Sequence, residues 1–140
     1  MSIIPSPAQT LLGSDAVAHV WTRNADGSPQ GIGRLGHRRG DEILFGTSDA
    51  SEKAKNLRRD PSIILSIEDT ERNARGFQRH LLISGRAELE PGPNPVLMDR
   101  LAMKYAGLAK HPLALRDSPS SLIVRVKIER ISGEGPWVEA

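Results

Sequence analysis

The sequence predicts a mainly β fold, in which an antiparallel sheet of six or so strands closes into a small barrel accompanied by two or three helices. Strand-like segments follow one another without the regular strand–helix alternation that a parallel sheet requires. The clearest of them is residues 122–131, where apolar and charged side chains alternate as in a half-buried strand. The residues expected to face the core there are Leu122, Val124, Val126 and Ile128.

Composition limits both the number of domains and the function classes. We expect residues 1–140 to form one domain, because this length suffices for a single hydrophobic core. A net charge of +2 and only two Trp, two Phe and one Tyr make nucleic acid an unexpected partner. The chain has no cysteine, and its four histidines lack metal-ligand spacing, so we expect no metal site. No apolar run could span a membrane and no secretory signal is evident, which favours a cytoplasmic protein.

The first third of the chain predicts a helix and a hairpin. Residues 6–12 are expected to form a short helix that ends at a glycine, and residues 17–22 the first strand. Asp26 and Gly27 make a turn, after which residues 28–36 return as an antiparallel strand. That strand contains three glycines, which mark either a close approach of another group to the backbone or a flexible, partly exposed edge strand.

Residues 45–61 carry the strongest indication of a ligand site. A strand leads into small hydroxyl residues and then into a short basic helix that stops at Asp60, because the residue before a proline leaves the helical region. Hydroxyl groups, free N–H groups at a helix start and a lysine one turn in form a combination that binds phosphate or carboxylate. We expect Lys53 to be exposed near the helix start. The basic face consists of Lys55, Arg58 and Arg59, and the alternative is an ordinary solvated surface helix.

The second half of the chain predicts further strands and one more helix. Residues 62–68 indicate a buried strand, residues 69–78 a polar loop, and residues 79–89 a long strand interrupted at Gly85. A helix is expected to begin at Pro95 and to present a core face with apolar residues every four positions. That face consists of Leu97, Leu101 and Tyr105.

Residues 45–61 resemble the flavin- and deazaflavin-binding oxidoreductases related to pyridoxamine-phosphate oxidase. In that family a strand ending in threonine is followed by a serine, a lysine and the run Asn-Leu-Arg-Arg-Asp-Pro. Here these are Thr47, Ser51, Lys53 and residues 56–61. The resemblance extends over about residues 17–133, and the order and spacing of its short motifs carry it. It implies a six-stranded antiparallel split β-barrel and a homodimer with the cofactor at the interface.

The resemblance also implies an activity and a cofactor. It implies an oxidoreductase that transfers a hydride between F420 or FMN and a small organic substrate. F420 is favoured because relatives assigned to it carry a late Lys-Tyr-x-Gly, here Lys104, Tyr105 and Gly107. Lys53 is implied as the principal charged contact to the cofactor's phosphate. The implied cofactor-binding residues are Gln30, Gly31, Ile32, Gly33, Thr47, Ser48, Ser51, Lys53 and His80.

One departure from the family pattern keeps a second function class open. Many relatives carry bulky aromatic residues where this chain has residues 34–36, and this chain has none there. The alternative is therefore a non-catalytic flavin- or haem-binding carrier on the same barrel. For His80, a structural role is the alternative to a cofactor contact. The sequence identifies neither the substrate nor a catalytic acid or base.

Overall fold

The computed structural model describes residues 3–14, 16–34, 36–92, 95–106 and 121–138. Gly107 of the late Lys-Tyr-x-Gly motif lies outside this part of the chain, and so do the side chains of Lys104 and Tyr105. Within the described residues, no helix is both long and apolar enough to cross a membrane.

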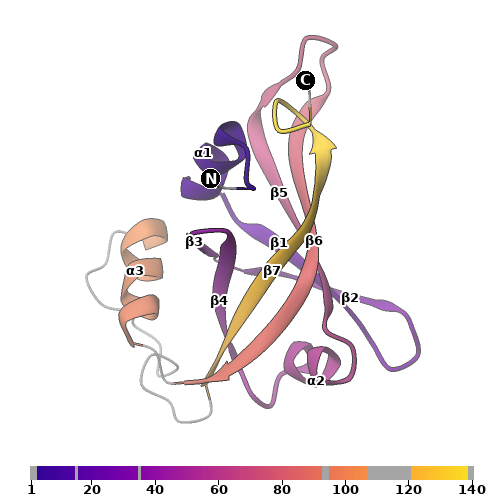
Figure 1. Cartoon of the computed structure of the whole chain (residues 1–140), viewed down its shortest axis with the longest axis vertical. Helices are drawn as coiled ribbons and strands as arrows, with labels where there is room; N and C mark the ends of the chain where they lie inside the picture. The colour runs from indigo at the N-terminus through magenta and orange to yellow at the C-terminus, as the bar shows by residue number, and fades with distance from the viewer. Residues whose placement is uncertain (1–2, 15, 35, 93–94, 107–120, 139–140) are drawn as a thin grey trace.

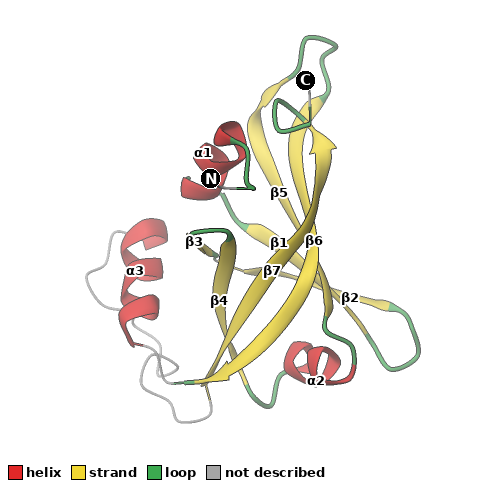
Figure 2. Cartoon of the chain, in the orientation of Figure 1, coloured by secondary structure: helices red, strands yellow, loops and turns green. Residues whose placement is uncertain are grey.

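The described residues form three helices and seven strands (Figures 1 and 2). They are α1 (Ser6–Gly13), β1 (Ala18–Arg23), β2 (Pro29–Arg34), β3 (His37–Arg39), β4 (Glu42–Ser48), α2 (Glu52–Arg59), β5 (Ser62–Arg72), β6 (Gln78–Pro91), α3 (Pro95–Ala106) and β7 (Ser121–Glu134). The mainly β class and the helix count are confirmed. The strand count is seven instead of six, because β3 is a short strand where only a turn was expected.

All seven strands form one antiparallel sheet in the order β2-β1-β5-β6-β7-β4-β3. The long strands β5, β6 and β7 make up its centre, and β2 and β3 are its two edges. Figure 1 shows that these strands cross the molecule with a strong twist and that α2 lies near the end of the sheet where β4 ends. Because β2 and β3 each have a neighbour on one side only, their other side has backbone N–H and C=O groups that pair with no strand.

The main core lies on the inner face of the sheet. Val20, Leu65, Ile83 and Val124 are among its fully buried residues, and they come from four neighbouring strands. The predicted alternation of β7 is confirmed from Val124 to Ile128, since Val124 and Val126 are buried in this core and Ile128 packs against it. Before Val124 the alternation is lost, because residues 121–124 are all buried. Burial of each such side chain contributes about 1.5–3 kcal/mol, so this face is the principal source of stability.

A second, smaller core explains why β4 and β7 are apolar on both faces. The helix α3 places Leu97 and Leu101 against Leu44 of β4 and Ile123 of β7, and all four are buried. The predicted core face of α3 is confirmed for its two described leucines.

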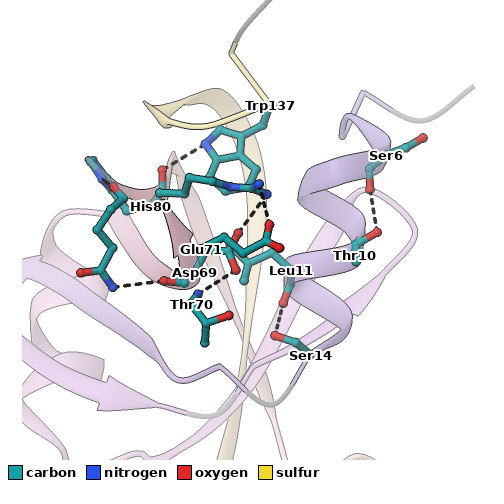
Figure 3. Close-up of polar contacts among 11 residues, drawn as sticks. Ser6, Thr10, Leu11, Ser14, Asp69, Thr70, Glu71, His80 and Trp137 are labelled. Carbon is teal, nitrogen blue, oxygen red and sulfur yellow. Dashed lines mark hydrogen bonds and ion pairs between the residues drawn. The ribbon is translucent and has the colours of Figure 1, made fainter. Parts of the chain in front are cut away.

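The loop expected over residues 69–78 is shorter than predicted: residues 73–77 form a turn, and the polar residues 69–72 before it belong to a strand. The strand β5 continues to Arg72 and pairs with β6 in a hairpin. Arg79 on β6 binds both Asp69 and Glu71 on β5, at 2.9 and 2.7 Å. Figure 3 shows these two acidic side chains converging beside Trp137. Cross-strand ion pairs thus stabilise the pairing of β5 with β6 in a segment whose sequence is too polar to predict a strand.

The interruption expected at Gly85 is a β-bulge. Ser84 pairs with Arg130 and Gly85 with Ile128, which leaves Glu129 as the extra residue of β7. A Cβ at position 85 would collide with the carbonyl oxygen of Lys127, so only glycine allows the two strands to approach here.

This contact predicts a stability effect. We expect Gly85→Ala to lower the free energy of unfolding by about 1–3 kcal/mol, because the added methyl must push the two central strands apart. Gly13→Ala is the matched control, since a Cβ there meets nothing within 4 Å, and its effect should stay within about 0.5 kcal/mol. Urea denaturation of both variants measures the difference, and equal midpoints would contradict this account of the bulge.

Candidate functional site

The start of α2 gathers three polar side chains that the sequence singled out. Ser51 is the N-cap, and its Oγ accepts a hydrogen bond from the backbone N–H of Ala54 at 3.1 Å. The buried Thr47, at the end of β4, donates its hydroxyl to Ser51 Oγ at 3.0 Å. Ser51 Oγ thus accepts both of these bonds, and its own proton is left to donate to another group. Beside them, the half-buried Ser48 accepts a bond from Ala50 N–H at 3.3 Å.

Lys53 lies at the second position of α2, and the expectation that it is exposed is wrong. Its exposure is 1%, whereas Lys55, one residue beyond Ala54, is exposed. The physical reason is that α2 packs against β1, β4 and β6, so the buried side of this short helix is wide enough to include Lys53 and Asn56 as well as Ala54 and Leu57. Lys53 also has an interaction partner in the structure. A lysine side chain is thus buried in the first turn of α2, two residues after the N-cap Ser51.

A buried hydrogen-bond chain connects α2 to the β1–β2 hairpin. Asn56 Nδ2 donates to Thr22 Oγ1 at 3.1 Å and to Asn24 Oδ1 at 3.0 Å. Thr22 Oγ1 in turn donates to Gln30 Oε1 on β2 at 3.2 Å. Thr22 and Asn56 are 4% and 2% exposed, so their bonds are shielded from water and strongly orienting.

The basic face of α2 is solvated and largely engaged with its own neighbourhood. Arg58 donates to the carbonyl oxygen of Asp49 at 2.9 Å, and Arg59 to that of Arg23 at 2.6 Å. Lys55 Nζ lies 3.7 Å from Oε1 of Glu52 and forms an ion pair with it. At the other end of the helix, hydrogen bonds from Ser62 lower the pKa of Asp60. These groups anchor the helix and its flanking turns, as the alternative of a solvated charged face proposed.

The glycine-containing strand β2 is an edge of the sheet, and the group that closely approaches its backbone is a side chain of the same protein chain. Trp21 pairs with Gly31, and a Cβ on Gly31 would collide with the indole ring. The indole therefore lies directly on the outer side of this glycine while remaining 42% exposed. Ile32 is 38% exposed and Gly33 is open apart from Val17. The free backbone edge of residues 30–33 stays accessible, whereas the outer side of Gly31 is occupied.

His80 lies at the other end of the sheet from α2. Its carbonyl oxygen accepts a hydrogen bond from Trp137 Nε1 at 3.0 Å, and Figure 3 shows both residues beside the β5–β6 hairpin. Ala87 on the same strand bonds to the carbonyl of Pro61, directly after α2. Ala87 lies seven positions beyond His80 along β6, which corresponds to about 23 Å. Within one chain, His80 is therefore not brought together with Thr47 and Ser51.

The structure thus brings Thr47, Ser48 and Ser51 together before the first turn of α2, and Lys53 lies on the buried side of that helix. Gln30 is linked to the helix through Thr22, whereas residues 31–33 lie on the edge strand β2 and His80 lies at the far end of the sheet. The sequence reasoning left Thr22, Asn24 and Asn56 out of the site. Asn56 stood inside the quoted family motif, which was a usable signal, but nothing in the sequence indicated its partners across more than 30 residues.

One open groove lies near this region, and another lies at the opposite end of the sheet. One, of about 430 Å³, lies on the outer face of the sheet beside Trp21, Ile64 and Glu129. The other, of about 630 Å³, lies between α1 and the polar end of β5, where Figure 3 shows Thr10, Ser14 and Asp69. The described residues contain no cluster of three or more histidine or acidic side chains that could hold a metal ion.

Comparison with known proteins gives a family match and many similar folds. The family model described as pyridoxamine 5'-phosphate oxidase matches residues 5–134. No curated protein sequence matches the chain significantly. One similar solved structure is an F420 reductase, 24% identical, with a TM-score of 0.78 over 92% of this chain and 98% of that one.

Two further structures share the fold at lower identity. A putative pyridoxamine 5'-phosphate oxidase from Listeria innocua is 19% identical, with a TM-score of 0.68 over 91% of this chain and 94% of that one. HutZ, the haem storage protein from Vibrio cholerae, is 13% identical, with a TM-score of 0.71 over 96% of each chain. At these identities, the likeness establishes the fold alone.

Proposed function

The chain belongs to the pyridoxamine 5'-phosphate oxidase family, and from this we propose that it is an oxidoreductase that uses F420 or FMN. The bound cofactor would exchange a hydride with a small organic substrate. F420 is our first choice, because the F420 reductase has the highest TM-score of the three structures named above. The absence of cysteine fits a cytoplasmic setting, which we propose as well.

The observation that carries the proposal is the polar arrangement at the start of α2. The Ser51 hydroxyl has a proton left to donate, and the first backbone N–H groups of the helix have no intrahelical acceptor. The helix dipole favours an anion at this end, and the charge of Lys53 adds to that field in a shielded environment. These groups fit a phosphate, and we assign the phosphate of the cofactor to Ser51, Thr47 and Lys53, with Ser48 at the rim.

The edge of β2 would hold the other part of the cofactor. Backbone groups of residues 30–33 lie on an unpaired sheet edge, where a planar ring finds both donors and acceptors. Trp21 behind Gly31 stiffens this edge from the outer side. The protein would thereby fix the ring relative to the phosphate and limit the access of water.

We also propose a homodimer with the cofactor at its interface. Trp21 and Ile64 are opposite each other on β1 and β5, and they are 42% and 45% exposed. Two adjacent large apolar side chains on a sheet face favour contact with a second protein surface. This face adjoins β2, so a partner chain seated on it would also border the ring. His80 of a partner chain would be free to approach the site in such a dimer.

The second candidate function is a haem carrier, which the similarity to HutZ favours. Incubation of the purified protein with reduced F420 or FMN and a panel of quinones and other electron-poor acceptors separates the two. For an oxidoreductase, we expect protein-dependent oxidation of the cofactor, with deuterium from the labelled cofactor found in the product. Tight stoichiometric haem binding, without binding of F420 or FMN, would instead establish the carrier.

A further inference from the structure

The orientation of the Gln30 side chain is fixed by a hydrogen-bond relay that begins at the buried Asn56 of α2. Its Oε1 accepts the hydroxyl of Thr22 at 3.2 Å, and Thr22 Oγ1 accepts Nδ2 of Asn56 at 3.1 Å. Asn56 is held by a further bond to Asn24 Oδ1 at 3.0 Å, and its own Oδ1 accepts from Arg59 at 3.2 Å. The relay therefore runs from α2 through β1 to β2, with a defined direction at each step.

The direction of the relay decides what Gln30 offers to a ligand. Because Asn56 donates to the Thr22 oxygen, the Thr22 proton is left to point at Gln30, and only the carbonyl end of the Gln30 amide can accept it. The NH2 end of the amide is then turned away from Thr22. Within the described part of the chain, Nε2 of Gln30 has no partner, and the side chain is half-buried. The relay thus presents a hydrogen-bond donor from the β2 edge.

We propose that Thr22 and Asn56 are positioning residues. They orient Nε2 of Gln30 toward a hydrogen-bond acceptor on the part of the cofactor that carries the ring and not the phosphate. The inference rests on the proposed function. Asn56 lies five residues beyond the N-cap Ser51, which corresponds to about 7.5 Å along the helix. The relay therefore reaches the site away from the phosphate position, on the side of the edge strand. The Gln30 donor would therefore favour a ligand that places a carbonyl oxygen or an unprotonated ring nitrogen beside the β2 edge.

Isosteric and conservative variants separate positioning from folding. Thr22→Val removes the hydroxyl while keeping the shape, Thr22→Ser keeps the hydroxyl, and Gln30→Leu removes the donor. Thermal unfolding of each variant without ligand shows that it is folded. Dissociation constants are then measured by fluorescence titration with two matched pairs of probes, FMN with riboflavin, and F420 with its deazaflavin fragment that lacks the phosphate tail.

The expected result has three parts. Thr22→Val and Gln30→Leu each weaken binding by about three- to tenfold, and by the same factor for both members of a pair. The double variant is no worse than Gln30→Leu alone, because both changes remove the same contact. Thr22→Ser binds like the unaltered protein. The visible absorption band of the bound cofactor shifts by the same amount in Thr22→Val and Gln30→Leu.

Several outcomes overturn the inference. One is an unchanged affinity and spectrum in Thr22→Val, and another is additivity of the two changes. A loss confined to FMN and F420, with riboflavin and the fragment unaffected, would place the Gln30 contact at the phosphate instead. If the unaltered protein binds none of the four probes, the proposed function fails and this inference fails with it, whereas binding combined with an inert Thr22→Val overturns the inference alone.

Discussion

Replacing Lys53 by methionine is expected to weaken the binding of FMN or F420 about tenfold to a hundredfold. A charge-assisted hydrogen bond contributes about 1.5–3 kcal/mol, and each ~1.4 kcal/mol is a factor of ten in the dissociation constant. Methionine keeps most of the side-chain volume at a position that is 1% exposed, so it removes the charge without opening a cavity. Isothermal titration measures the change.

Riboflavin and Lys55→Met are the matched controls for this change. Riboflavin lacks the phosphate, so its affinity should be the same in Lys53→Met and in the unaltered protein. Lys55 lies on the solvated face with its side chain 59% exposed, and Lys55→Met should change neither affinity by more than about twofold. Equal losses for FMN and riboflavin would show that Lys53 supports the fold of the site and not the phosphate. Lys53→Ala is expected to lower the melting temperature more than Lys53→Met does, because it leaves a buried void in addition to removing the interaction of the ammonium group.

Replacing Ile64 by aspartate is expected to abolish the proposed dimer at micromolar concentration. In a twofold interface each substitution occurs twice, so the loss of apolar burial and the cost of desolvating a carboxylate both count double. We expect the dissociation constant of the dimer to rise at least a hundredfold. Sedimentation velocity of Ile64→Asp should then show a monomer, with cofactor affinity reduced in parallel.

Val96→Asp provides the control for this surface. Val96 is 62% exposed on α3, away from the Trp21 and Ile64 face, so the same charge there should leave the sedimentation coefficient unchanged. A monomeric unaltered protein, or an Ile64→Asp variant that remains dimeric, would contradict the proposed interface.

The boundaries of α2 could be predicted from the sequence, and the burial of its side chains could not. Ser51 as a cap and the Asp60–Pro61 stop are local signals, and the structure places the helix between them. Lys53 lay off both helical stripes, so helical periodicity gave no reason to bury it. Its burial follows from three strands packing on one short helix, which is information about tertiary structure.

The glycine-rich strand and the polar end of β5 show the same division. The glycines of β2 left open a close approach to the backbone or an exposed edge strand, and only the strand register identifies the indole of Trp21 as the group above Gly31. Residues 69–72 suggested a loop because they are all polar, so they show no alternation of apolar and polar side chains. Only the pairing with Arg79 across the hairpin explains why that segment is a strand.

The most direct test of the account is an equilibrium titration of the purified protein with F420 and with FMN, followed by absorbance and fluorescence. Binding at the start of α2 and the edge of β2 predicts saturation at one cofactor per chain for at least one of the two. It also predicts that Lys53→Met lowers that affinity at unchanged stoichiometry. Absence of saturable binding of both cofactors to the folded protein would contradict the central claim.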